Sequence, residues 1–283
     1  MKVTTAYSGE SANESVALPT TRPRHKTWQR NAYAYLFLLP WLAGLLILTV
    51  IPIFSSFYLS FTHYDLIGSP RWIGARNYVA MFGTDLRYRK ALQVTFTYVG
   101  LGVPLQLLTA LALAFVLNKG VPGLPTLRAI FYIPSLLGGS VAIAILWRRM
   151  FAYDGLVNQL LSFLGYQFTG LPTSYVTNPR YALYTLILLL IWAFGSPMII
   201  FLAGLRQIPN ELYDAADIDG AGPLKRLRFI TVPLLTPIVF FNLVMQIISA
   251  FQAFTSAFIV GAGRGGREIA YFFTHYIFMK GVF

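Results

Sequence analysis

The chain has 283 residues, of which 56% are hydrophobic and only 11% are charged, and its formal net charge is +12. A soluble globular domain carries about 25% charged residues, so we expect much of this surface to face lipid rather than water. The Lys and Arg residues stand in short segments between long apolar runs, which favours contact with lipid headgroups over nucleic acid, and the absence of cysteine excludes disulfides and thiolate metal sites.

Five apolar stretches are long enough to cross a bilayer as helices, since a span needs about 20 mostly apolar residues. In chain order they are Tyr33–Phe61, Leu92–Leu117, Leu127–Trp147, Ala182–Leu205 and Pro233–Val260. Prolines inside these stretches are expected to kink their helices. The last apolar stretch, Ile269–Phe283, is too short to span, and we expect a sixth span to follow it in the native chain. The predicted fold class is therefore an all-α polytopic membrane helix bundle.

The domain organisation follows from these stretches. Residues 1–32 form a polar basic tail, 33–62 the first transmembrane helix, 63–90 an outer segment and 91–283 the transmembrane core. If the N-terminus is cytoplasmic, eleven Lys and Arg residues lie on each side of the membrane, so the number of basic residues does not decide the orientation. The four basic residues between Arg22 and Arg30, just before the first helix, favour a cytoplasmic N-terminus.

The segment 208–230, between the fourth and fifth spans, carries the most specific signal. Pro209 suits the first position of a short helix, and Gly220 and Gly222 are expected to end it. An apolar face with helical spacing and small residues is formed by Ile208, Leu212, Ala215 and Ala216. The rest of the surface of this segment carries acidic side chains, at Glu211, Asp214, Asp217 and Asp219. A small-residue face lets another surface approach closely, which predicts a docking segment; a surface helix without a partner is the alternative.

The run Asp214-Ala215-Ala216, followed after two further residues by an Asp219-Gly220-Ala221 run, resembles the EAA signature of permease subunits of binding-protein-dependent ABC importers. The longer frame is similar to the sugar-permease branch, which imports maltose, oligosaccharides and glycerol-3-phosphate. Weaker similarity extends over Leu38–Pro40, Asn77–Tyr78, Arg128–Pro134 and Leu202–Pro209. The signature usually begins with Glu, so Asp214 keeps the charge but shortens its reach.

The resemblance implies the type I ABC importer transmembrane fold and a place in the bacterial inner membrane, with residues 63–90 periplasmic. It also implies that 208–230 is the coupling segment, which docks on a cytoplasmic ATPase dimer. The coupling residues would be Glu211, Asp214, Ala215, Ala216, Asp219, Gly220 and Ala221. The further partners implied are a second permease subunit in a heterodimer and a periplasmic or lipid-anchored solute-binding protein. The chain would be no enzyme and bind no cofactor itself; ATP and Mg would sit on the ATPase, in keeping with the absence of a Gly-x-x-x-x-Gly-Lys-Ser/Thr motif.

A second group of polar residues predicts a path for the solute. Side chains stepping along one face of the fifth span, roughly 120° wide, are Asn242, Gln246, Ser249, Gln252 and Ser256. Trp192 and Ser196, on the fourth span, could line the same cavity. Amides, hydroxyls and rings suit the hydroxyls and apolar faces of a sugar. Interhelical hydrogen bonding that serves packing alone is the alternative.

Two other functions remain open on the residues alone. An ion-coupled secondary transporter or channel would work without an ATPase, although no ionisable residue lies at the centre of a span, where such transporters often carry an acid. A membrane-embedded enzyme would need clustered histidines or acids near the membrane surface. The three histidines are far apart in sequence, so we expect neither a catalytic nor a metal site.

Overall fold

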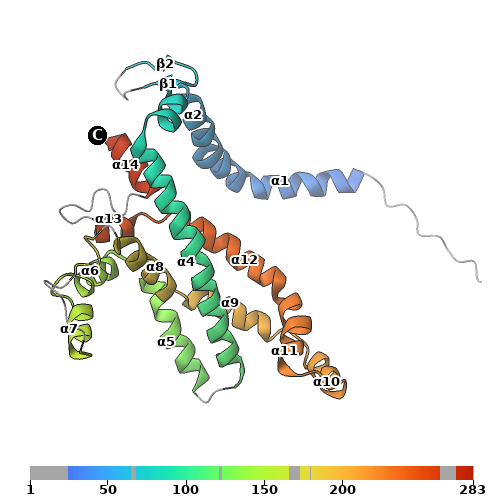
Figure 1. Ribbon diagram of the computed structural model, residues 1–283. Helices are drawn as coiled ribbons and strands as arrows, with labels where there is room; N and C mark the ends of the chain where they lie inside the picture. Colours follow the sequence, from blue (N-terminus) through green and yellow to red (C-terminus); the bar gives the residue numbers. More distant parts are fainter. Residues whose placement is uncertain are drawn as a thin grey trace, which may run out of the picture. The chain divides into compact units, whose positions relative to one another are not determined.

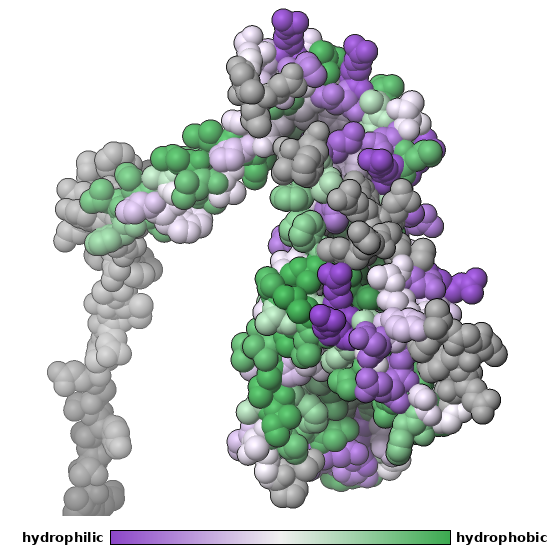
Figure 2. Space-filling view, turned by 90° about the vertical axis from the view of Figure 1, so that its left-hand side faces the viewer, coloured by the Kyte–Doolittle hydropathy of each residue, from purple (hydrophilic) through white to green (hydrophobic). Residues whose placement is uncertain are grey.

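The computed structural model describes residues 25–64, 68–120, 123–165, 173–178, 180–261 and 272–282. The chain divides into two compact units, residues 1–78 and 79–283. The first unit contains α1 (His25–Leu45), a π-helical turn η1 (Leu46–Val50), α2 (Ile51–Leu59), the antiparallel strands β1 (Thr62–His63) and β2 (Arg71–Trp72), and the start of α3 (Arg76–Gly83). Hydrophobic side chains of the continuous helix Tyr35–Leu59 are exposed (Figure 2), as expected of a lipid-facing span.

The second unit is built around one long helix, α4 (Leu86–Asn118), which packs against α8, α9 and α12 (Figure 1). The other helices are α5 (Leu124–Leu137), α6 (Val141–Met150), α7 (Leu156–Phe163), α8 (Ala182–Trp192), α9 (Gly195–Leu205), α10 (Asn210–Ile218), α11 (Pro223–Arg226), the π-helical η2 (Leu227–Thr231), α12 (Val232–Phe251), α13 (Thr255–Gly261) and α14 (Phe273–Val282). In Figure 1 the α10–α11 segment lies at the opposite end of the unit from the start of α4. The predicted all-α membrane bundle is confirmed.

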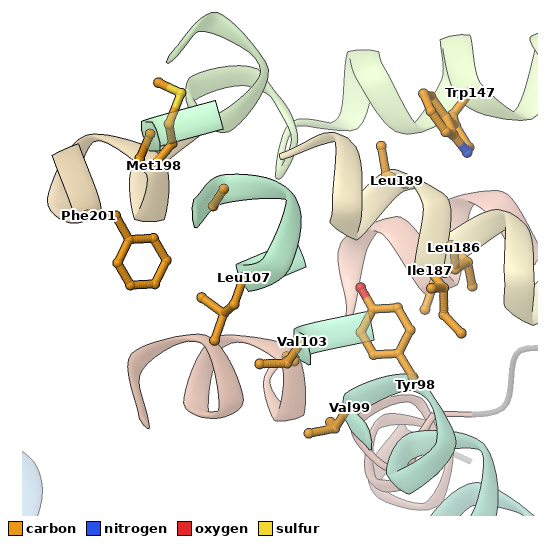
Figure 3. Close-up of a cluster of buried hydrophobic side chains, with 14 of the residues drawn as sticks. Tyr98, Val99, Val103, Leu107, Trp147, Leu186, Ile187, Leu189, Met198 and Phe201 are labelled. Atoms are coloured by element: carbon orange, nitrogen blue, oxygen red, sulfur yellow. The ribbon is translucent and has the colours of Figure 1, made fainter. Parts of the chain in front are cut away.

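The core lies between α4 and the pair α8–α9. Figure 3 shows side chains of α4 (Val103 and Leu107) and of α9 (Phe201) gathered in this core. These side chains are nearly or fully buried. Gly102 lets α4 approach α8 closely, because a Cβ at this position would lie 2.7 Å from the Leu190 Cδ2.

Two predicted spans are broken helices instead of straight ones. Leu127–Trp147 is divided into α5 and α6, which bend by 95°, and Ala182–Leu205 into α8 and α9, which bend by 41°. The third correction concerns Pro233–Val260, because α12 ends at Phe251 and a separate short helix, α13, comes after it. Prolines predicted kinks in these spans, but the bends also need glycines where helices approach closely, as at Gly195 in α9 against α5.

The C-terminal helix α14 is fastened to the start of α4. Asp85 caps α4 by accepting hydrogen bonds from the backbone N–H groups of Arg87 (2.9 Å) and Tyr88 (3.2 Å). The same carboxylate accepts from the Tyr276 hydroxyl (2.9 Å) and lies 3.8 Å from the Lys280 ammonium. Burial raises the pKa of Asp85, but these hydrogen bonds outweigh it, so the pKa lies below its usual 3.8.

Acidification should release α14 from α4. Because the folded-state pKa of Asp85 is lowered, its stabilising contribution is present above about pH 4 and is lost as the pH falls through the lowered value. Hydrogen exchange of the α14 amides should therefore accelerate when the pH is lowered from above the usual Asp pKa of 3.8 to below the lowered value, after correction for the intrinsic rate. Asp85→Asn should exchange fast at both pH values; the same acid-induced acceleration in this variant would contradict the assignment.

Gly195 should tolerate no side chain. An added Cβ would clash with the Phe131 carbonyl oxygen and lie 2.8 Å from the Tyr132 Cα, which are backbone atoms that cannot swing aside. Gly195→Ala should destabilise by about 1–3 kcal/mol and lower the melting temperature in detergent by about 2–10 °C, measured by tryptophan fluorescence. Gly100→Ala is the control, because Gly100 is also helical and has nothing within 4 Å of an added Cβ; equal melting temperatures for the two variants would refute the close packing.

Candidate functional site

A cavity of about 410 Å³ opens where the two broken spans meet α4 and α12. Its polar lining consists of Tyr98, Gln106, Ser135, Ser196, Gln246, Ser249, Gln252, Thr255 and Ser256. Pro197, Leu189, Leu190 and Phe254 contribute apolar surface. No described residue that lines the cavity carries a charge at neutral pH. Such a lining offers hydrogen bonds to hydroxyl groups and apolar surface to a ring.

Five of the seven residues predicted for a solute path line this cavity: Ser196, Gln246, Ser249, Gln252 and Ser256. They do so for a different reason from the one predicted, because α12 ends before Gln252 and no single helix face carries them all. The break brings Gln252 and Ser256 to the cavity from the turn and from α13.

The other two predicted residues point elsewhere. The ring of Trp192 lies beside that of Trp147, with centroids 5.8 Å apart and the ring planes tilted by 41°. Asn242 is fully buried, and neither atom of its amide group has a hydrogen-bond partner among the described residues. The expectation that Asn242 and Trp192 line the cavity is therefore wrong in this structure.

The wall of the cavity is held by hydrogen bonds at the break between α8 and α9. The carbonyl of Ala193 cannot pair within the helix, because the residue four positions later is Pro197, which has no N–H. The Gln106 amide (3.0 Å) and the Ser135 hydroxyl (2.9 Å) donate to it instead. Ser135 Oγ also accepts from the backbone N–H of Ser196 at 2.7 Å. One polar joint thus connects α4, α5 and the broken span.

Sequence reasoning missed Tyr98, Gln106 and Ser135 as cavity residues. Gln106 and Ser135 are lone polar groups in apolar runs, the same signal that singled out the α12 residues, whereas Tyr98 stands next to Thr97. Pro197 gave a further signal, because a proline in a membrane helix requires a donor for the carbonyl it frees. The sequence does not show which helices provide that donor, because Ser135 and Gln106 are 58 and 87 positions away from Ala193 in the chain.

The second candidate site is the α10–α11 segment. Pro209 stands as the N-cap of α10, not as its first residue as predicted. Gly220 ends the helix with φ of +67°, as predicted, whereas Gly222 has an ordinary φ of −65° and precedes α11. The residues predicted for coupling lie on α10 and this turn: Glu211, Asp214, Ala215, Ala216, Asp219, Gly220 and Ala221.

The predicted apolar docking face does not form a single outward surface. Ile208 and Ala216 are only 7% and 8% exposed and pack onto the chain's own helices. Ala215 and Leu212 are exposed. The prediction that all four present one face to a partner is wrong, because the bundle itself covers half of it.

Two side-chain contacts fix α10 to the helices that come after it in the chain. Arg226 forms an ion pair with Asp217, and its Nε donates to the Ala221 carbonyl at 2.7 Å. The Tyr213 hydroxyl shares a hydrogen bond of 2.9 Å with the Thr231 hydroxyl on η2. Since η2 continues directly into α12, displacement of α10 would be transmitted to the helix that carries Gln246 and Ser249.

Metal chemistry has no support at either site. Within the described ranges no three His, Asp or Glu side chains come close enough to hold a metal ion. The acidic side chains of α10 are spread along an exposed helix.

Comparison with known proteins agrees with these sites. Residues 127–281 match the family described as binding-protein-dependent transport system inner membrane component. The chain is 51% identical over 236 residues to the probable ABC transporter permease protein YesP of Bacillus subtilis, covering 83% of this chain and 75% of that one. It is 33% identical to the trehalose/maltose transport system permease protein MalF of Thermococcus litoralis, covering 82% and 78%.

A solved structure shares the fold. The chain superposes with a TM-score of 0.76 on a chain of a bacterial ABC transporter involved in the import of the acidic polysaccharide alginate, with 24% identity and coverage of 91% of this chain and 87% of that one. At this identity the likeness supports the architecture, and the sequence relatives support the family.

Proposed function

This chain belongs to the family of binding-protein-dependent transport system inner membrane components, and on that premise we propose that it forms half of the translocation pathway for a sugar or related solute. It is a multi-pass membrane permease of an ABC importer, and it is a transport subunit, not an enzyme. The observation that carries the proposed pathway is the uncharged cavity of amides and hydroxyls between the two broken spans.

The lining of the cavity favours a saccharide or polyol. Amide and hydroxyl groups can both donate to and accept from sugar hydroxyls, and Phe254 and Pro197 offer surface to the apolar faces of the rings. Saccharides appear in the names of the trehalose/maltose permease and the alginate importer. An oligosaccharide, a polyol or a glycerol phosphate each presents several hydroxyls to such a lining.

The proposal includes partners that supply the energy and the other half of the pathway. A cytoplasmic ATPase dimer would bind ATP and Mg and dock on α10, and a second permease subunit would complete the pathway as a heterodimer. A periplasmic or lipid-anchored binding protein would deliver the solute. This arrangement requires a cytoplasmic N-terminus, which puts α10 and α11 in the cytoplasm and the start of α4 outside.

Removing polar groups from the cavity should slow uptake without preventing assembly. Gln246→Leu deletes hydrogen bonds to solute hydroxyls worth about 0.5–1.5 kcal/mol, so the maximal rate of uptake should fall about three- to tenfold. The measurement is uptake of labelled oligosaccharides by proteoliposomes with the complete transporter and saturating binding protein. Met245→Leu is the control, because Met245 is exposed on the same helix and does not line the cavity. Unchanged uptake by Gln246→Leu combined with Gln252→Leu would exclude this cavity from the pathway.

Gly220→Val should uncouple transport. Valine at φ of +67° is strained, while the added Cβ meets nothing within 4 Å, so the effect acts on the turn and not on packing. Uptake should fall at least tenfold, while immunoblots show the normal amount of protein in the membrane.

Gly222→Ala is the matched control for this turn. Gly222 lies two residues away, has a negative φ and likewise has nothing within 4 Å of an added Cβ. It should transport normally. Normal uptake by Gly220→Val would contradict the coupling role, and transport by the purified chain without any ATPase would favour an ion-coupled transporter instead.

A further inference from the structure

The short helix α7 (Leu156–Phe163) lies at the edge of the second unit, beside α6 (Figure 1). On its inner side Asn158 is buried, and its side-chain amide donates to the carbonyls of Tyr153 and Thr173 at 2.9 Å each. Gly155, just before α7, packs on the backbone at the end of α6, which leaves no room for a Cβ. These contacts fix which face of α7 points away from the bundle.

The outward face of α7 carries a row of four large apolar side chains, which we call the apolar stripe: Leu156, Leu160, Phe163 and Leu164. Their spacing of i, i+4, i+7 and i+8 places them within an arc of roughly 100°. All four are exposed, and Phe163 is 86% exposed. The exposed polar residues Gln159 and Ser162 lie beside this arc. The helix is therefore amphipathic, and the rest of the described chain leaves its apolar stripe uncovered.

The end of α6, just before α7, lies at the level where α8 begins. Trp147 of α6 donates from its Nε1 to the carbonyl of Thr185, in the first turn of α8, at 3.0 Å. A chain of neighbouring rings marks the same level, with centroids 5.1 to 6.4 Å apart: Trp147, Phe151, Tyr175 and Tyr181. Trp and Tyr side chains are enriched at the boundary between lipid and water. Because α8 and α9 lead from here to α10, this boundary belongs to the end of the bundle opposite α10.

Two basic residues, Arg148 and Arg149, end α6 at this level. Neither has an ion-pair partner among the described residues. Guanidinium groups pair well with phosphate oxygens. A protein surface would match the apolar stripe alone. A bilayer matches the stripe, the rings and the two cations together, because acyl chains, headgroups and phosphates meet at its boundary.

We infer that α7 is an interfacial helix, embedded in the leaflet at the end of the bundle opposite α10. Its apolar stripe faces the acyl chains, and Arg148 and Arg149 pair with lipid phosphates. Since α6 packs against α13, which brings Ser256 to the cavity, α7 also fastens one wall of the cavity to the lipid. The inference needs only a chain that spans a membrane, and it goes beyond the proposed function.

The test measures the depth of α7 in the bilayer with a nitroxide spin label. The chain has no cysteine, so an introduced cysteine is the only labelling position on it. Leu160→Cys is labelled in the complete transporter in nanodiscs of phosphatidylethanolamine and phosphatidylglycerol, and the unsubstituted transporter treated in the same way gives the background. Collisions with oxygen, which dissolves in lipid, are compared with collisions with a water-soluble nickel chelate. The label at Leu160 should lie about 5–10 Å below the phosphates.

Ser162→Cys is the matched control, because Ser162 is exposed on the opposite side of α7 from Leu160. Its label should collide mainly with the nickel chelate. Frequent nickel collisions at both positions would place α7 in water and overturn the inference. Rare collisions of the Leu160 label with both reagents would also overturn it, because the apolar stripe would then be covered by a protein subunit.

A second variant tests the phosphate contacts. Arg148→Gln combined with Arg149→Gln should move the Leu160 label toward water, out of the range of about 5–10 Å, because the phosphates no longer hold the end of α6. Arg87→Gln combined with Lys90→Gln is the control pair, exposed on α4, and should leave the label depth unchanged. An equal shift in both double variants, or none in either, would overturn the phosphate contacts. A label depth that responds to added inorganic phosphate and not to the removal of phosphatidylglycerol would overturn the assignment to lipid.

Discussion

The carbonyl of Ala193 is the group on which the arrangement of this membrane domain depends. Inside a bilayer no water satisfies a free backbone group, and each such group left unpaired costs several kcal/mol. Pro197 frees this carbonyl, and donors from α4 and α5 replace the missing N–H. The bend of the span is therefore stable only while Gln106 and Ser135 are in place, so three helices are positioned by one requirement.

The cavity follows from the same requirement. A straight α8–α9 helix would leave no unpaired carbonyl at Ala193, and the polar joint would have no reason to exist. Irregular backbone at membrane depth is tolerated where it is buried in protein or lines a cavity, and here it does both. The second break, between α5 and α6, falls beside the first, since a Cβ on Gly138 would lie 3.1 Å from the Cβ of Ala193. The two breaks together make room for Gln246 and Ser249 to face open space.

Much of the fold could be predicted because long apolar segments identify the helices that can span a bilayer. All five predicted stretches appear as helices or bent helix pairs. The breaks were invisible to the same signal, because a three-residue interruption such as Gly138–Ser140 barely changes a window of about 20 residues. Pro134 and Pro197 indicated kinks, but the size of each bend depends on partners from other helices. Local sequence therefore predicts that a helix is weakened, while its neighbours decide where it turns.

The two candidate sites also differ in how far local sequence predicts them. The turn of the coupling segment is local, so Gly220 could be assigned from sequence alone. The outward face of α10 is not local, because the packing of the bundle decides which side chains are covered. It covers Ala216 of α10 and the preceding Ile208, and it leaves Ile218 exposed. Asn242 gives the converse case: its spacing with Gln246 predicted a cavity residue, yet it lies fully buried between packed helices. Helical periodicity groups side chains on one face, but only the neighbouring helices determine whether that face meets a solute, a partner or the protein core.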